Sequence, residues 1–245
     1  MTQSESFWPW LLKWTAICLV CAFFGLLILQ PVFQTAGSGR RRTPCRNNLH
    51  NIGIALHNYH DRFGSFPPAY VADKRGRPMH SWRVLILPWL GEEAAAVYSE
   101  YRFDEPWNGP NNRRLAERRP EFYRCPQDKR LKGGEDVLTA YQAISGPGCA
   151  FDADRARRIP EFQDGTSVSL MVVESPGTPV HWMQPVDVSA DELLRSLPSV
   201  KDVPHQGGIM ILMGDGAVRY LASNVPPETL RALTTIAGGD EPGEF

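Results

Sequence analysis

The chain has 245 residues and nearly balanced charge, with 26 Lys and Arg against 27 Asp and Glu and a formal net charge of −1. Because binding to a phosphate backbone needs a basic surface, this balance gives no electrostatic basis for a nucleic-acid partner. The 21 glycines and 21 prolines predict many turns and few long helices after the first apolar segment.

The most apolar part of the chain is residues 7–33, FWPWLLKWTAICLVCAFFGLLILQPVF. No charge occurs from Trp14 to Leu29, and with the apolar residues before them the segment reaches the roughly 20 residues that span a bilayer as a helix. Tryptophans gather at one end, as in an interfacial aromatic belt. A cleaved signal peptide is the alternative, but residues 34–36 match its small-residue cleavage pattern poorly. We therefore predict an uncleaved N-terminal transmembrane anchor over residues 1–36.

A basic linker over residues 37–44 is expected to precede a second helical segment, which either continues from the anchor or restarts after it. Apolar residues recur there at intervals of three and four, as on one stripe of a helix: Leu49, Ile52, Leu56, Tyr59 and Phe63. Gly64 and the prolines that follow end the pattern. We expect the first four of these side chains to face a sheet that includes a hairpin at residues 209–221.

The same helical segment carries His50, His57, His60 and Asp61. Histidines one or two turns apart on one face can converge on a metal ion. The simpler interpretation is a polar flank of the helix, with Asp61 four residues after His57. No second segment completes a ligand set by its spacing, so no metal site is predicted here.

Shorter elements follow between many turns. They are a buried strand or helical turn at 84–87, a helix at 92–102, a strand leading into a turn at 141–148, a strand at 167–173 after the Asp164-Gly165 turn, a helix at 191–197, and a helix at 226–236. One helix in front of several strands predicts an α+β fold with an antiparallel sheet and long loops.

HQGGIMILMGDGAVRYL, residues 205–221, predicts a β-hairpin. Asp215-Gly216 suits a two-residue type I′ turn, whose central residues need positive φ. His205 is expected to brace the start of the hairpin, and Asp215 to accept hydrogen bonds within its own turn. Because five strand residues separate the two ends by more than about 15 Å, no direct bond between His205 and Asp215 is expected.

Five cysteines are present. Cys18 and Cys21 fall in the apolar segment, where they are expected to act as small apolar residues. Cys45, Cys125 and Cys149 form no C-x-x-C pair, which argues against a zinc site. In an oxidising compartment two of the three could bond, and the sequence leaves the choice open. One hypothesis to test is a bond between Cys45 at the helix start and Cys125, if the domain lies outside the cytoplasm.

The ordered motifs CRNNLHNIGIALHNYHDRFGSFPPAY, SWRVLILPWL, DEPWNGPNNRRL, FYRCP, SGPGCAF and DGTSVSLMVVE, closed by H-x9-D-G, resemble a bacterial family known as domain of unknown function 1559. The resemblance implies a pilin-like domain over residues 45–245, with a long helix packed on an antiparallel sheet as in pilins and pseudopilins. It also implies structural roles for the motif residues, which are Cys45, Asn48, Leu49, Trp82, Arg83, Cys125, Asp164, Gly165, Thr166, His205, Gly208, Asp215 and Gly216.

Two features depart from this pattern or conflict with it. The chain lacks the G-F-T-L-I-E prepilin signal and has SESFWPWLLKW near that place, so filament assembly is not expected from the sequence. Arg40, Arg41, Arg42 and Arg46 follow the anchor, which by the positive-inside rule would place the domain in the cytoplasm. The resemblance places it outside, and we expect that orientation, with the anchor in the inner membrane.

No G-x-S-x-G, H-E-x-x-H or phosphate-binding G-x-x-x-x-G-K-[ST] motif occurs. We expect a non-enzymatic pseudopilin-like protein of the cell envelope without cofactor or metal. It would contact the lipid bilayer through residues 7–33, and envelope proteins or copies of itself through the domain. One alternative is a metal-dependent enzyme that uses His57, His60 and Asp61, or His205 and Asp215. Another is a carbohydrate-binding module, which an exposed coplanar row of tryptophans would favour, formed from Trp82, Trp107 and Trp182.

Overall fold

The computed structural model describes residues 7–131, 137–200, 205–243 and 245, without the side chains of residues 7–10 and 25–41. The chain divides into two compact units, Met1–Thr43 and Pro44–Phe245. Helix α1 (Phe7–Phe63) contributes to both.

In the first unit, the described side chains of residues 11–24 are exposed, and many of them are large and apolar, including Leu19, Phe23 and Phe24. Within the described residues, no helix combines the length and apolar character needed to cross a membrane. The transmembrane helix predicted for residues 7–33 is therefore not confirmed, and the side chains at 7–10 and 25–33 of that segment lie outside the described ones. Residues 37–44, expected as a linker, are helical, so the helix continues rather than restarts.

The second unit is built on a four-stranded antiparallel sheet with the order β4-β5-β7-β8. Its strands are β4 (Tyr141–Ala143), β5 (Leu170–Glu174), β7 (Gly208–Met213) and β8 (Val218–Ala222). Every residue of β5 and β7 is buried, because both faces of the sheet are covered. The predicted α+β class with an antiparallel sheet is confirmed.

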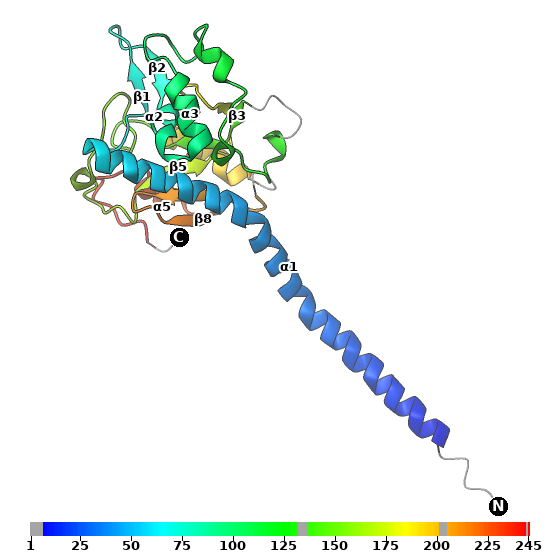
Figure 1. The fold of residues 1–245 in the computed structure, drawn as a ribbon. Helices are drawn as coiled ribbons and strands as arrows, with labels where there is room; N and C mark the ends of the chain where they lie inside the picture. Colours follow the sequence, from blue (N-terminus) through cyan, green and yellow to red (C-terminus); the bar gives the residue numbers. More distant parts are fainter. Residues whose placement is uncertain (1–6, 132–136, 201–204, 244) are drawn as a thin grey trace, which may run out of the picture. The chain divides into compact units, whose positions relative to one another are not determined.

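One face of this sheet is covered by the C-terminal part of α1 (Figure 1). Leu49, Ile52 and Leu56 have no exposed surface and share a core cluster with Met210 and Leu212 of β7. The approach is close, since a Cβ atom added at Gly53 would lie 2.9 Å from Leu212 Cδ1. The predicted packing of the apolar stripe on the hairpin is confirmed.

The stripe ends earlier than its period suggests. Tyr59 is only partly buried, and Phe63 is 57% exposed. Phe63 lies against the rings of Tyr59 and Trp89 at the rim of the core.

Helices α4 (Ala190–Ser196) and α5 (Pro227–Thr234) contribute to the cluster on the opposite face of the sheet. Their leucines, Leu193, Leu230 and Leu233, join Ile209 and Ile211 of β7 there. The Ser189 hydroxyl caps α4 by accepting from the Glu192 amide, and proline occupies the first turn of α5, where no hydrogen bond is lost.

The remaining elements are short. They comprise the hairpin β1 (Tyr70–Ala72) and β2 (Pro78–Ser81), the strand pair β3 (Leu138–Thr139) and β6 (Val180–His181), and the helices α2 (Trp82–Leu85) and α3 (Glu92–Glu100). Single-turn 3-10 helices occur at η1 (Leu87–Trp89), η2 (Asn112–Leu115), η3 (Glu121–Tyr123), η4 (Lys129–Leu131), η5 (Ile159–Glu161) and η6 (Leu197–Ser199). The hairpin β1–β2 and the pair β3–β6 were not predicted, because strands of two to four residues show little periodicity.

Candidate functional site

The fold brings four buried side chains with ligand-type atoms into one cluster: Cys45, Cys125, Glu174 and His205. They come from α1, the segment after η3, the end of β5 and the residues before β7. One sulfur, nitrogen or carboxylate oxygen from each lies within 4.8 Å of the others. In the described part of the chain, no other group of three or more potential metal ligands comes this close.

A disulfide joins Cys45 to Cys125 across 80 residues of sequence, with their Cα atoms 5.1 Å apart. This separation lies in the normal range, and the hypothesised pair is confirmed. Cys149 is buried and not bonded, and burial raises the pKa of its thiol to about 11. The bond ties the start of the packed part of α1 to the FYRCP segment.

Glu174 is the partner of His205, with His205 Nε2 3.0 Å from Glu174 Oε2. The same carboxylate oxygen accepts a hydrogen bond of 3.1 Å from the Met210 amide. Both side chains are almost fully buried, and the ring N–H is not aligned for a hydrogen bond to the carboxylate. Sequence reasoning missed Glu174. Its only signal is an acidic residue at the end of the buried strand LMVVE, where a partner is required.

Tyr141 and Asn48 lie beside this cluster. The Tyr141 hydroxyl donates to the Cys45 carbonyl at 3.5 Å, and the Asn48 amide nitrogen donates to Tyr141 Oη at 3.4 Å and to the Arg124 carbonyl at 2.6 Å. Burial raises the pKa of the Tyr141 phenol well above its ordinary value, and the nearby Glu174 carboxylate raises it further. The phenol therefore stays protonated and can act as a hydrogen-bond donor.

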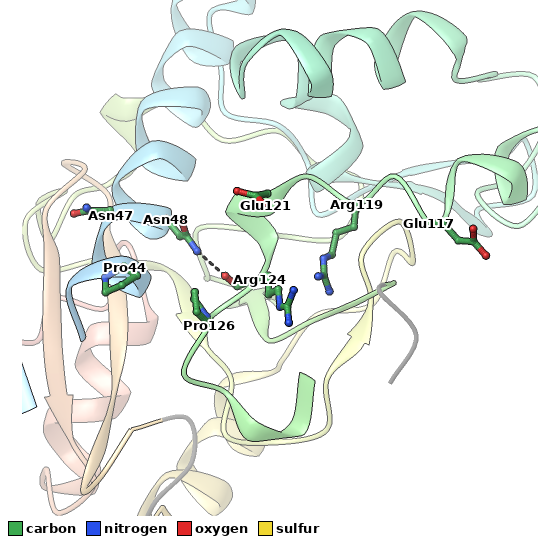
Figure 2. Close-up of a pocket in the computed structure, with 8 residues that line it drawn as sticks. All are labelled: Pro44, Asn47, Asn48, Glu117, Arg119, Glu121, Arg124 and Pro126. Atoms are coloured by element: carbon green, nitrogen blue, oxygen red, sulfur yellow. Dashed lines mark hydrogen bonds between the residues drawn. The ribbon is translucent and has the colours of Figure 1, made fainter. Parts of the chain in front are cut away.

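A pocket of about 670 Å³ opens beside the disulfide segments (Figure 2). Its lining includes chain neighbours of both cysteines, which are Pro44, Arg124 and Pro126. Figure 2 shows Arg119 and Arg124 in the lining of this pocket, with the Asn48 amide bonded to the Arg124 carbonyl. The remaining lining residues are Asn47, Glu117 and Glu121.

Trp82 and Arg83 are fully buried structural residues. Arg83 Nη2 lies 2.5 Å from Asp187 Oδ1, and Arg83 Nε donates to the Tyr141 carbonyl at 2.9 Å. The Trp82 indole nitrogen and the Ala143 amide donate to the same Asp187 oxygen. Burial raises the pKa of Asp187, and the positive charge of Arg83 opposes that rise. Together these contacts join α2 to β4 and to the segment before α4.

Asp164, Gly165 and Thr166 form a second structural connection. The Asp164 carboxylate accepts from the Gly238 amide at 2.7 Å and the Gly239 amide at 2.8 Å, which ties the C-terminal segment to this turn. Gly165 has a φ of +103°, and the Thr166 carbonyl accepts from the Asp215 amide. The motif therefore positions the tip of the β7–β8 hairpin.

The hairpin turn differs from the prediction of a two-residue type I′ loop. The Gly216 amide donates to the Met213 carbonyl, and the Met213 amide donates to the Ala217 carbonyl, which leaves three residues in the loop. Among the turn residues only Gly216 has a positive φ, at +85°. This arrangement is a bulged turn, and it is less strained because Asp215 keeps a negative φ that suits an L-residue.

The expected roles of Asp215 and Gly208 hold in the structure. Asp215 Oδ1 accepts from the Ala217 amide at 2.8 Å within its own turn, at the end of β7 opposite His205. His205 and Asp215 thus form no dyad. At Gly208, an added Cβ would lie 2.2 Å from the Leu221 carbonyl oxygen, so no other residue fits without displacing β8.

The histidines of α1 are not brought together with further ligands in the described residues. The rings of His57 and His60 contact Phe66, and His60 Nδ1 is 3.8 Å from the exposed Asp61 carboxylate. The two imidazole rings therefore pack on the Phe66 ring and do not converge on a shared metal position.

The tryptophans form no exposed row. Trp82 and Trp182 have no exposed surface, and the Trp182 indole nitrogen donates to the Ala116 carbonyl. Trp107 is half-buried against the His181 ring. The exposed tryptophan row that would favour the carbohydrate-binding alternative is therefore not formed by these three residues.

Comparison with known families matches residues 34–194, more than half of the chain, to a family described as "Protein of unknown function (DUF1559)". The chain belongs to this family. The match spans both cysteines, Arg83 and Glu174 but ends before His205. Comparisons with curated proteins and with solved structures found no match. Membership in the DUF1559 family assigns no reaction, so the function has to be argued from the site.

Proposed function

We propose that this DUF1559 protein is a membrane-anchored, pilin-like protein of the cell envelope that works through protein contacts rather than catalysis. The observation that carries the proposal is the difference in side-chain burial between two parts of α1. Its residues 45–56 supply a buried stripe to an antiparallel sheet, while the described apolar side chains at residues 11–24 are exposed. A helix with one end in a sheet-based core and a free apolar end is the arrangement expected of a pilin-like subunit.

The exposed apolar side chains at residues 11–24 of α1 need a partner that shields them from water. Leu19 is 71% exposed and Phe23 is 61% exposed. Leaving such side chains in water costs roughly 25 cal/mol for each Å² of apolar surface, and contiguous exposed apolar surface marks a membrane or protein contact. A lipid bilayer is the cover that agrees with the uncharged run from Trp14 to Leu29.

The disulfide supports a location outside the cytoplasm. Bonds such as Cys45–Cys125 form and persist in oxidising compartments and are rare in the cytosol. This favours the orientation that the family resemblance implies over the one that Arg40, Arg41 and Arg42 would favour.

The structural use of the motif residues supports a non-enzymatic role. Arg83 forms an internal ion pair with Asp187. Asp164 accepts hydrogen bonds from backbone amides, and Asp215 accepts one from an amide within its own turn. None of these three is directed to the pocket beside the disulfide, whose lining contains none of them.

The test is expression of the full chain in a Gram-negative host, followed by fractionation and protease treatment of spheroplasts. We expect the protein in the inner-membrane fraction, resistant to alkaline extraction, with the C-terminal domain degraded in intact spheroplasts. Leu19→Lys combined with Phe23→Lys should release it, whereas Lys13→Gln should not. A soluble wild-type protein, or a domain protected in intact spheroplasts, would contradict the proposal.

A further inference from the structure

The cluster of Cys45, Cys125, Glu174 and His205 carries a second inference, which does not depend on the membrane anchor. Two cysteine sulfurs, an imidazole and a carboxylate are the donor types of zinc sites. Each residue comes from a different segment, and all four are buried. Such convergence needs a reason, because buried polar groups are costly unless they are paired.

The polar members are incompletely paired as they stand. His205 Nε2 and Glu174 Oε1 are buried atoms without a hydrogen-bond partner of ordinary geometry among the described residues, although the Tyr141 hydroxyl lies beside the Glu174 carboxylate. His205 Nε2 nevertheless lies 3.0 Å from Glu174 Oε2, and one ring nitrogen of His205 lies within 4.8 Å of both cysteine sulfurs. Leaving a buried acceptor or donor unsatisfied costs about 1–3 kcal/mol. A cation placed among these atoms would satisfy both.

We propose that reduction of the Cys45–Cys125 disulfide converts this cluster into a four-ligand site for a zinc ion. A dithiol reductant breaks the Sγ–Sγ bond by supplying two electrons and two protons, and is itself oxidised to a disulfide. The divalent ion then displaces the two thiol protons. It binds both thiolates, one nitrogen of His205 and one carboxylate oxygen of Glu174.

The donor set selects the class of metal. Thiolates with imidazole favour zinc and related borderline or soft ions, whereas magnesium and calcium take oxygen ligands. Bonds of about 2.0–2.3 Å to a tetrahedral zinc place its ligand atoms roughly 3.4–3.8 Å apart. Reduction lets the two bonded sulfurs separate to this spacing, and donor atoms that already lie within 4.8 Å of one another need only small shifts to reach it.

Surrounding residues would support such a site. The Met210 amide donates to Glu174 Oε2 and leaves the other carboxylate oxygen available. Hydrogen bonds of this kind orient a carboxylate ligand toward its metal. The pocket lined by Pro44, Arg124 and Pro126 gives a reductant an approach to the segments that carry the two cysteines.

The test uses the purified full chain in detergent, prepared once with the disulfide intact and once reduced by a phosphine that is then removed. Zinc ions are titrated against a chromogenic chelator, and the metal content is measured after desalting. We expect one zinc per reduced chain and none per oxidised chain, with a higher Tm for the reduced chain when zinc is present. Cobalt in place of zinc should give a thiolate-to-cobalt absorption band.

Variants identify the ligands. His205→Ala and Glu174→Gln should each weaken zinc binding by the reduced chain more than about 100-fold, since loss of a supporting partner alone costs 10–100-fold. Cys149→Ala removes the other thiol of the domain, and His57→Ala removes a histidine outside the cluster, so both should bind zinc like the wild type. Circular dichroism reports whether each variant is folded.

The comparison of oxidised and reduced wild-type protein stands even if a variant fails to fold. The inference is overturned if the reduced wild type binds no zinc or if the oxidised chain binds it equally. It is also overturned if folded His205→Ala and Glu174→Gln bind zinc as tightly as the wild type.

Discussion

The guanidinium of Arg83 and the carboxylate of Asp187 form an ion pair from which water is almost excluded. The side chains are 0% and 3% exposed, and Arg83 Nη2 is 2.5 Å from Asp187 Oδ1. The two residues are 104 positions apart, so the pair fastens α2 to the segment before α4. Arg83 also donates to the Ser81 hydroxyl and the Tyr141 carbonyl, which uses its fork of donors on several partners.

Arg83→Met should therefore lower the free energy of unfolding by about 3–5 kcal/mol, because it leaves a buried carboxylate unpaired. Arg83→Lys should also be destabilising, since one ammonium group cannot reach the acceptors that the planar guanidinium reaches. Chemical denaturation measures both. The control is Arg77→Met, which removes an exposed ion pair with Asp73 and should cost at most about 1 kcal/mol. Equal losses for Arg83→Met and Arg77→Met would disprove the structural role of the buried pair.

Leu56→Ala should lower the free energy of unfolding by about 2–5 kcal/mol, because it leaves a cavity between α1 and the sheet. Ile54→Ala is a matched control on the same helix, at a side chain that is 46% exposed, and should cost much less. Thermal or urea unfolding compares the two. If both variants unfold alike, the stripe at Leu49, Ile52 and Leu56 does not face the sheet.

His205→Ala should lower the free energy of unfolding by about 1–3 kcal/mol, because Glu174 loses its neighbour in a buried site. Asp215→Ala, at the other end of β7, removes only a hydrogen bond to the exposed Ala217 amide and should cost less than about 1.5 kcal/mol. The double variant should give the sum of the two losses, since distant sites add. A coupling energy above about 0.5 kcal/mol between them would show that the two residues interact.

His80 predicts a pH dependence of stability. Burial lowers the pKa of its imidazole below the usual 6.5, and the ring is held between the Tyr101 hydroxyl and the Phe103 carbonyl. As the pH falls through about 6.5, the unfolded chain takes up a proton on this histidine that the folded chain resists. The free energy of unfolding should therefore decrease from pH 7.5 to pH 5.5.

Urea denaturation at the two pH values tests this expectation. His80→Gln should reduce the loss of stability on acidification, whereas His50→Gln, at an exposed position of α1, should leave it unchanged. Carboxylates contribute to the pH dependence in all three proteins, so the informative quantity is the difference between variants. The same loss in His80→Gln and the wild type would show that His80 does not carry the effect.

Gly216→Val should destabilise the hairpin, because a β-branched residue at a φ of +85° is strained by about 1–3 kcal/mol. Gly214→Ala is a less suitable control, since a Cβ there would lie 2.9 Å from the Thr166 carbonyl oxygen. Gly76→Val is the better control, with a similar φ and no atom near its added Cβ. Unfolding measurements should show a lower free energy of unfolding for both Gly216→Val and Gly76→Val. A larger loss at Gly216 would come from its position beside His57, and a loss only at Gly76 would contradict the assigned turn.

Local features of this protein follow from the sequence by itself. The spacing of Leu49, Ile52 and Leu56 identifies a buried helix face because the α-helix repeats every 3.6 residues. The apolar run at 209–213 followed by Asp215-Gly216 identifies the hairpin, since turn chemistry acts over a few residues. The ordered motifs identify the family. The predicted two-residue turn was wrong because Asp-Gly suits both two-residue and three-residue loops. Packing of the turn against Thr166 decides between the two.

Tertiary structure alone decided which polar groups meet. Glu174 ends β5 and His205 lies before β7, and Arg83 and Asp187 lie 104 residues apart, so no local pattern relates either pair. The positions of the short strands β3 and β6 and of the pocket beside Cys45 and Cys125 depend likewise on long-range packing. The physical reason is that periodicity records which face of an element is apolar. A buried charge gains its partner only when separate elements, folded onto the same core, exclude water from both.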